Sequence, residues 1–364
     1  MTDVWERRRF LGVAGACAAL ALAGCAARPP RAARAVRGGA AAGSTQAAAR
    51  PVPALKPGAV VAVIAPASAV DGAADAAAAW LQARGYQPRL MLGARMDAPY
   101  DYLAGSDSLR LDQLHAAFSS AEVGAVWCLQ GGFGSWRLLD QIDYALIGAN
   151  PKPFIGYSDI TALHLALQQR VGFVTFHGPM LGQDFIVGRA EPTESLAWAM
   201  LSGQVGAGSW IEAPPGSQVV ALAPGQASGR LVGGNLALIS ALMGTDNEID
   251  TRGAILFIED VNELPPRVDR MLSQLAAAGK LDSVAGVLVG NFTRGSPGSD
   301  PAGQSLYWPI LRETLQGRGV PVLAGWPSGH WNPNLMLPLG ARVTLDAQRR
   351  ALRLDQVIVE NRAT

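Results

Sequence analysis

Short apolar runs alternate with segments of helical spacing along most of the chain. Residues 59–66, A-V-V-A-V-I-A-P, form a continuous run rich in β-branched residues, which is typical of a buried parallel strand. Residues 73–85 and 106–118 have helical spacing, and the second segment begins with a serine that can cap it. This alternation predicts a doubly wound α/β domain over residues 52–185. Further strands are predicted at residues 87–92, 124–129, 153–157 and 172–177.

A second set of strand and helix patterns follows a segment with little pattern. Residues 186–225 are rich in glycine, proline and serine, apart from one helical stretch at 191–201, and indicate a connection. Residues 226–360 then predict a second domain, with strands at 254–260, 284–292, 321–326 and 341–346 and a helix near 267–278. A chain of 364 residues, 49 % hydrophobic and 16 % charged, can bury the cores of two such domains.

The first 25 residues have the pattern of an export signal. A basic start precedes an apolar stretch at 10–23 that is too short to span a bilayer. Residues 7–11, R-R-R-F-L, resemble a twin-arginine signal, and the tetrapeptide L-A-G-C that ends at Cys25 resembles a lipobox, in which Cys25 is lipidated. A plain secretory signal with a chance cysteine is the alternative. We expect a periplasmic protein held by a lipid anchor, and Ala26, which is not aspartate, slightly favours the outer membrane.

Residues 26–50 predict a disordered basic tether, because they hold five arginines, no acid and no periodicity. Without the ten charged residues of the leader and tether, 22 basic and 27 acidic side chains remain, a net charge near −5. A basic tether on an acidic body suits an anionic membrane surface and gives no support for nucleic-acid binding. Only Cys128 of the three cysteines lies in the body, so we expect a buried thiol and neither a disulfide nor a cysteine metal site.

Two loops that follow predicted strands carry candidate chemistry, since open α/β sheets bind ligands at the carboxyl ends of their strands. In the first, Q-G-G-F-G-S at 130–135, glycines let backbone N–H groups approach a ligand, although a tight turn without a ligand explains the pattern at least as well. In the second, Ser158 lies between a buried strand and a helix, which is the position of a nucleophile elbow. The second glycine of G-x-S-x-G is missing, so the local residues alone favour a helix cap at Ser158 or Asp159.

A serine nucleophile needs a base, and the chain has four histidines. His115 lies in an amphipathic helix, and His164 lies more than one helical turn beyond Ser158. His177 ends a strand and His330 lies in a loop dense in glycine, proline and asparagine. Since a histidine in such a loop is seldom a core residue, position favours His330 over His177 as the base.

The base in turn needs an orienting acid, and two carboxylates follow directly on the apolar run at 255–258. Glu259 and Asp260 end a buried strand, so each must have a partner. A salt bridge to Arg267 or Arg270 is the structural alternative. A metal site is disfavoured, because no H-x-x-x-H or similar spacing is present.

With these residues the chain resembles the LD-carboxypeptidase family of serine peptidases, which includes muramoyltetrapeptide carboxypeptidases and microcin C immunity proteins. Six motifs in the right order and spacing carry the resemblance over roughly residues 55–350. They are Gly131-Gly132-Phe133-Gly134-Ser135 with Arg137-Leu138-Leu139, Gly156-Tyr157-Ser158-Asp159-Ile160-Thr161, His177-Gly178-Pro179, Gly233-Gly234-Asn235-Leu236, Phe257-Ile258-Glu259-Asp260, and Gly329-His330 with Asn334 and Leu337-Pro338-Leu339-Gly340.

The resemblance implies a site as well as a fold. Ser158 would be the nucleophile, Glu259 the acid and His330 the base, with an oxyanion hole from the backbone N–H groups of Asp159 and Gly132. The fold would be a flavodoxin-like domain plus a smaller C-terminal domain with a mixed, partly barrel-like sheet, and the site would lie between them without a cofactor.

Substrate contacts would come from a further set of residues. They are Gly131, Tyr157, His177, Asn235 and Arg267. Residues 263–267 read E-L-P-P-R where the family has E-x-P-Y-R, so a proline, Pro266, stands where the family has a tyrosine.

The resemblance implies hydrolysis of the L,D-peptide bond of a murein tetrapeptide, with release of terminal D-alanine. Peptide–nucleotide antibiotics of the microcin C type are the alternative substrate. A lipid-anchored solute-binding protein without catalysis is the alternative from another class, since a lipobox followed by two α/β lobes is its usual layout. The oligomeric state stays open, with a homodimer as one option.

Overall fold

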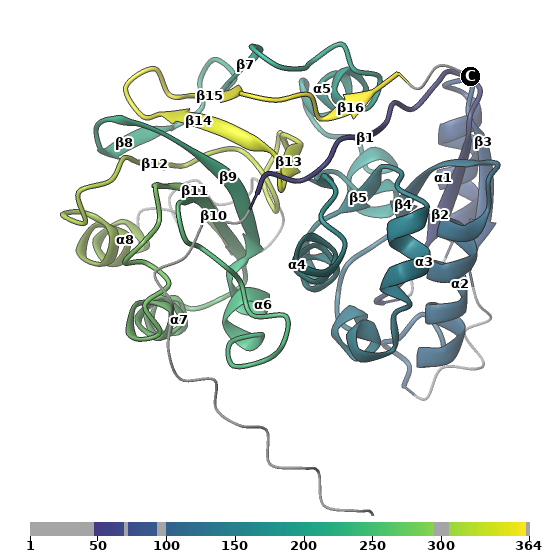
Figure 1. The fold of residues 1–364 in the computed structure, drawn as a ribbon, viewed down its shortest axis with the longest axis horizontal. Coiled ribbons are helices and arrows are strands. Elements are labelled where there is room, and N and C mark those ends of the chain that lie inside the picture. The colour runs from purple at the N-terminus through teal and green to yellow at the C-terminus, as the bar shows by residue number, and fades with distance from the viewer. Residues whose placement is uncertain (1–46, 69–71, 93–99, 295–305, 362–364) are drawn as a thin grey trace, which may run out of the picture. The chain divides into compact units, whose positions relative to one another are not determined.

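The computed structural model describes residues 47–68, 72–92, 100–294 and 306–361, which form two large sheets and a two-stranded pair (Figure 1). The export signal, Cys25 and the tether up to residue 46 lie outside the described residues. The end of the predicted tether is part of the fold: Ala49 is buried and its N–H donates to the Gly340 carbonyl over 2.9 Å. Among the described residues, no helix has the length and apolar character needed to cross a bilayer.

The first sheet has the strand order β13-β6-β5-β4-β2-β3. All neighbours are parallel except β13, which runs antiparallel to β6. The strand order reverses between β2 and β4, the position at which open α/β sheets commonly bind ligands. In this chain hydrogen bonds join the loops after these two strands, among them the Ser68 N–H to the Gly131 carbonyl over 3.1 Å. The strands are β2 (Val60–Ile64), β3 (Gln87–Met91), β4 (Val123–Cys128), β5 (Phe154–Gly156), β6 (Thr175–His177) and β13 (Leu337–Leu339).

The helices between the strands of the first sheet confirm the predicted alternation of strands and helices. Ser106 caps α2, because its Oγ accepts a hydrogen bond from the Leu109 N–H over 3.2 Å. The first eight residues of α4 are all buried, because α4 packs against the first sheet and also against β9 of the second. The helices are α1 (Ala73–Gln82), α2 (Asp107–Ser119), α3 (Tyr144–Ala149), α4 (Thr161–Arg170) and α5 (Thr193–Leu201), with a 3-10 helix at Ser135–Gln141 and a π-helical turn at Leu181–Phe185.

The second sheet has the order β7-β15-β14-β9-β10-β11-β12-β8, with a parallel centre from β9 to β12 and antiparallel flanks. Its two edge strands do not pair with each other, so no closed barrel forms and the barrel-like part of the expectation is not met. Its strands are β7 (Trp210–Glu212), β8 (Val220–Ala223), β9 (Gln226–Asn235), β10 (Ala254–Val261), β11 (Gly286–Thr293), β12 (Val322–Ala324), β14 (Arg342–Asp346) and β15 (Ala351–Leu354).

The remaining elements complete this half of the chain. Both edge strands of the second sheet, β7 and β8, come from the segment predicted as a connection. The helices are α6 (Leu236–Ala241), α7 (Pro265–Ala277) and α8 (Trp308–Leu315), and the separate pair is β1 (Val52–Pro53) with β16 (Val359–Glu360).

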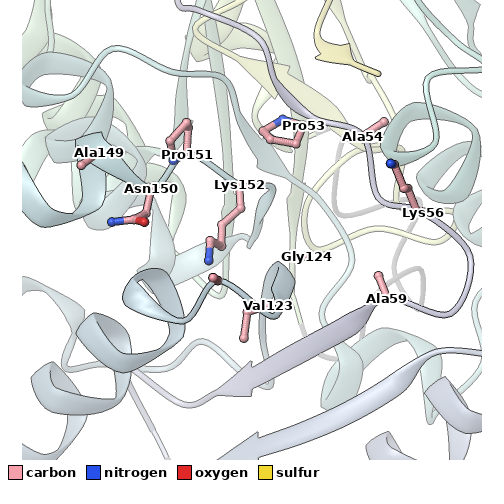
Figure 2. A pocket seen from close by; sticks show the side chains of 11 residues that line it. Pro53, Ala54, Lys56, Ala59, Val123, Gly124, Ala149, Asn150, Pro151 and Lys152 are labelled. Atoms are coloured by element: carbon pink, nitrogen blue, oxygen red, sulfur yellow. The ribbon is translucent and has the colours of Figure 1, made fainter. Parts of the chain in front are cut away.

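A cavity of about 330 Å³ lies at the amino ends of β2, β4 and β5 (Figure 2). Its buried Lys152 donates from Nζ to the carbonyls of Ser120 (2.8 Å) and Ala117 (3.3 Å), which close the end of α2. Burial lowers the pKa of Lys152 to about 8. The described lining holds no histidine, serine or carboxylate, so the candidate chemistry lies at the opposite edge of the sheet.

Two glycines at the end of β9 allow close packing of the two halves. Gly233 and Gly234 have φ angles of 131° and 139°. A Cβ atom on Gly233 would lie 1.8 Å from the Phe257 carbonyl oxygen, and one on Gly234 would lie 2.5 Å from Thr161 Oγ1. Only glycine therefore lets β9 approach both β10 and α4 at this point.

We expect Gly233→Ala to lower the free energy of unfolding by about 3 kcal/mol, because the added methyl group meets backbone. Gly216→Ala is the matched control: its φ is 83° and a Cβ atom there meets nothing within 4 Å. It should cost only the left-handed backbone strain, about 1 kcal/mol. Urea unfolding of both variants measures the difference, and equal losses would contradict the packing argument.

Candidate active site

Ser158 occupies a strained turn at the carboxyl end of β5. Its φ is 63°, in the left-handed region that residues other than glycine rarely adopt. A 3-10 turn, Ser158–Ile160, leads from it into α4. Neither Ser158 nor Asp159 caps that helix, so the capping interpretation is wrong. The left-handed conformation instead leaves the serine lining a cavity.

The glycine loop after β4 is fixed against this turn by Asp159. The buried Asp159 Oδ2 accepts the Ser135 N–H over 2.8 Å, and the Asp159 carbonyl accepts the Ser135 hydroxyl over 2.6 Å. A Cβ atom on Gly131 would lie 3.0 Å from Ser158 Cβ, so glycine lets the loop touch the serine. Gly132 lines the same cavity, and its N–H makes no hydrogen bond within the described part of the chain.

A buried arginine gathers the surrounding loops, and sequence reasoning missed it. The Arg110 guanidinium donates to the carbonyls of Gly134 (2.9 Å), Gly105 (3.3 Å) and Pro66, which belong to three different loops. Arg110 is 1 % exposed. The periodicity of α2 places position 110 on its buried face, so a charged residue on an apolar face was the available signal.

Glu259 and His330 form a hydrogen-bonded pair. His330 Nδ1 lies 2.8 Å from Glu259 Oε2, and the His330 backbone N–H donates to the same oxygen over 3.2 Å. Because a carboxylate only accepts, Nδ1 carries the proton, and the neutral ring keeps its lone pair on Nε2. Glu259 is fully buried at the end of β10, and His330 is 8 % exposed.

Each member of the pair shifts the pKa of the other. Burial would raise the pKa of Glu259, but the charge and hydrogen bond of His330 outweigh burial and hold that pKa below its usual value. Burial would likewise lower the pKa of His330, but Glu259 outweighs it and the pKa is raised. The pair is therefore tuned to keep a carboxylate behind a histidine that takes up a proton readily.

Glycines make room for the buried carboxylate. A Cβ atom on Gly329, whose φ is 84°, would lie 2.4 Å from Glu259 Oε2. A Cβ atom on Gly290 would lie 2.8 Å from Glu259 Cβ. Side chains at either position would displace the acid.

Ser158 and His330 line one cavity of about 760 Å³. No hydrogen bond joins the two side chains, but the His330 ring packs against Tyr157, with ring centroids 4.9 Å apart. Glu259 lies behind His330, away from the cavity lining. The described lining is Gly132, Tyr157, Ser158, Gly182, Gln183, Val187, Gly188, Arg189, Val261, Asn262, His330 and Asn332.

The other predicted contact residues lie outside this lining, Tyr157 excepted. His177 is buried against Tyr157 and Phe257, neither ring nitrogen has a hydrogen-bond partner, and burial lowers its pKa to about 4. Asn235 caps α6 by accepting the Leu238 N–H over 3.2 Å. Arg267 pairs with Glu263 at 3.5 Å, and 63 % of its side chain is exposed.

The two remaining histidines, His164 and His115, serve the fold. His164 Nε2 donates to the Gly156 carbonyl over 2.8 Å, and its Nδ1 lies 2.9 Å from the Thr175 hydroxyl. His115 Nε2 accepts the Asp143 N–H over 2.9 Å. These ring nitrogens of the two histidines therefore make hydrogen bonds to residues other than Ser158. Among the described residues, no group of three or more His, Cys, Asp and Glu side chains is placed to hold a metal ion.

Comparison with known proteins identifies the class to which this fold and site belong. Residues 61–178 match the LD-carboxypeptidase N-terminal domain, and residues 228–345 match the LD-carboxypeptidase C-terminal domain. The chain belongs to the LD-carboxypeptidase family and is a hydrolase of that carboxypeptidase class.

Three relatives place the chain within the family. It is 41 % identical over 308 residues to the probable murein peptide carboxypeptidase of Bacillus subtilis, covering 84 % of this chain and 95 % of the relative. The muramoyltetrapeptide carboxypeptidase structure from Oxalobacter formigenes is 28 % identical, with a TM-score of 0.67 over 84 % of this chain and all of the other. The microcin C7 self-immunity protein, 24 % identical with a TM-score of 0.72 over 85 % of this chain and 99 % of the other, shows the fold alone.

The pKa shifts predict distinct titrations of the histidines. His330 should titrate above the ordinary histidine pKa of about 6.5. His164 and His177, with pKa values lowered to about 3 and about 4 by burial, should stay neutral above pH 5. Histidine ring signals followed by NMR across pH, assigned with single His→Gln variants, test this. A His330 signal that titrates below the ordinary value would contradict the pairing with Glu259.

Proposed function

We propose that the protein is a serine carboxypeptidase that hydrolyses the L,D-peptide bond of a murein tetrapeptide and releases terminal D-alanine. The observation that carries the proposal is the Glu259–His330 hydrogen bond, 2.8 Å long, behind a cavity that a strained Ser158 also lines. The relatives named murein peptide carboxypeptidase and muramoyltetrapeptide carboxypeptidase support the substrate class. The strand order of the first sheet supports the flavodoxin-like description.

In the proposed reaction His330 Nε2 accepts the Ser158 hydroxyl proton as Oγ attacks the scissile carbonyl carbon. Glu259 stabilises the imidazolium that forms. The developing oxyanion accepts hydrogen bonds from the N–H groups of Gly132 and Asp159, each worth about 3 kcal/mol in the transition state. His330 then gives its proton to the amine of the departing D-alanine, and water hydrolyses the acyl-enzyme by the same path.

The proposed location follows from the amino-terminal residues. The predicted export signal and the lipobox-like L-A-G-C at Cys25 support a periplasmic enzyme on a lipid anchor. The basic residues 26–46 would lie beside anionic headgroups, while the acidic body reaches soluble muropeptides or the wall.

We expect Ser158→Ala to abolish release of D-alanine from disaccharide tetrapeptide, because the variant lacks the attacking oxygen. Mass spectrometry of tripeptide and D-alanine measures it, with Ser119→Ala as the matched control, because the Ser119 hydroxyl donates to the Ala116 carbonyl on α2 and lies outside the cavity lining. Activity of the Ser158 variant equal to that of the wild type would rule out the nucleophile. Cleavage of a microcin C-type peptide–nucleotide conjugate, with no cleavage of the muropeptide, would contradict the proposed murein substrate.

The fall of kcat/KM at acidic pH, the acidic limb of the rate profile, should follow the protonation of His330. Since the base must be deprotonated and its pKa is raised, kcat/KM should fall as pH drops through a value above the ordinary 6.5 or so. Glu259→Gln removes the cause of the raised pKa, so the limb should move to lower pH while kcat falls by roughly 10³–10⁴-fold. Steady-state rates from pH 5 to 9 decide this, and an unmoved limb in the variant would contradict the assignment.

A further inference from the structure

The cavity contains one cationic side chain that the proposed chemistry does not use. Of the described residues that line it, Arg189 is the only lysine or arginine. Its side chain is 9 % exposed. The buried carboxylate of Asp184 balances this charge, so the donors of the guanidinium that Asp184 does not engage decide what else Arg189 can bind.

The contacts of Arg189 occupy only part of its guanidinium. Nε donates to Asp184 Oδ1 over 2.9 Å, and Nη2 donates to the Gln183 carbonyl over 3.4 Å. Nη1 makes no hydrogen bond in the described part of the chain. Arginine presents its donors as a rigid planar fork that matches a carboxylate, so the group is held at one edge and free at another.

Asp184 fixes this arginine relative to both ends of the site. Asp184 is fully buried and accepts the Met180 N–H over 2.9 Å. Its Oδ1 also lies 3.5 Å from the hydroxyl of Tyr157, the residue before Ser158, and 3.5 Å from Asn334 Nδ2. Asn334 Oδ1 in turn accepts the N–H of Gly329, the residue before His330, over 2.8 Å.

The loop that carries Arg189 is held from its other side as well. The Ala190 N–H donates to Asn332 Oδ1 over 2.7 Å, and Asn332 lines the cavity. Arg189 is therefore positioned from two sides: Asp184 connects it to Tyr157, next to Ser158, and Ala190 connects its loop to Asn332, close to His330.

We propose that Arg189 binds the free C-terminal carboxylate of the substrate and thereby restricts hydrolysis to the last peptide bond. This inference rests on the proposed carboxypeptidase function. A tetrapeptide that ends in D-alanine carries a negative charge one residue beyond the scissile bond, whereas a C-terminal amide or a longer peptide lacks charge at that place. A charge-assisted bidentate pair with a guanidinium distinguishes these substrates.

The test measures binding in the Ser158→Ala background, where turnover does not interfere. Calorimetry compares a murein tetrapeptide with its C-terminal amide. We expect the free acid to bind roughly tenfold to hundredfold more tightly, the range for a hydrogen bond to a charged group. Adding Arg189→Gln should bring this ratio close to one, and Arg189→Lys should keep part of it.

Arg349→Gln is the matched control, because Arg349 is also an arginine paired with a carboxylate, Glu212, but its side chain is 46 % exposed and it lies outside the cavity lining. It should leave the acid-to-amide ratio unchanged. Arg189→Gln also leaves buried Asp184 without its ion-pair partner, so thermal melting must accompany the binding data. If that variant does not fold, Arg189→Gln with Asp184→Asn removes both charges together, and the ratio should still fall to one.

The inference and the proposed function fail in different ways. If wild-type protein releases no D-alanine, the proposed function is wrong. Tighter binding of the free acid than of the amide that depends on Arg189 would still support the carboxylate site. A preference for the free acid that survives in a folded Arg189→Gln protein overturns the inference, as does equal binding of acid and amide before Arg189 is changed. Absence of binding to either peptide overturns it too.

Discussion

The hydrogen bond between buried Glu259 and His330 is the interaction on which the site depends. Removing one partner of a buried pair leaves an uncompensated charge at a cost of about 3–5 kcal/mol, so β10 and the histidine loop must stay together. The same loop continues into β13, which pairs with β6 in the first sheet, where Leu337 faces His177. The acid of one sheet thus fixes a histidine that the other sheet also holds.

The serine side of the cavity is held by buried polar contacts in place of a helix cap. The Asp159 carboxylate accepts a hydrogen bond from Ser135 in the glycine loop. Arg110 donates to that loop at the Gly134 carbonyl and to two other loops at the carbonyls of Gly105 and Pro66. These contacts keep Ser158 in a left-handed conformation that costs on the order of 1–3 kcal/mol by itself. Strain at the turn is therefore supported by residues that never reach the cavity.

Much of the fold followed from periodicity, because the parallel strands are buried runs and the helices have amphipathic spacing. Glu259 stood out because it ends a buried apolar run, and His330 because it lies in a loop rich in glycine and proline. The local pattern at Ser158 favoured a helix cap, and only the resemblance over six motifs assigned roles to all three residues. Arg189 and Asp184 were missed because they lie in a segment whose glycines and prolines hide its structure, and only the tertiary fold brings them beside Tyr157. The edge strands β7 and β8 have only three and four residues, which is too short for an alternation of apolar and polar residues to be recognised. Which strand an edge strand pairs with is also not visible in its own residues.

The proposed mechanism requires that Ser158 is a nucleophile activated by His330 across the cavity that both residues line. Reaction with a fluorophosphonate, which forms a stable bond only with an activated serine, tests it most directly when the adduct is located by peptide mass mapping. We expect one adduct, on Ser158, that forms in wild-type protein, is prevented by excess tetrapeptide and is lost in His330→Ala. An adduct on another serine, or labelling of Ser158 that is as fast without His330, would contradict it.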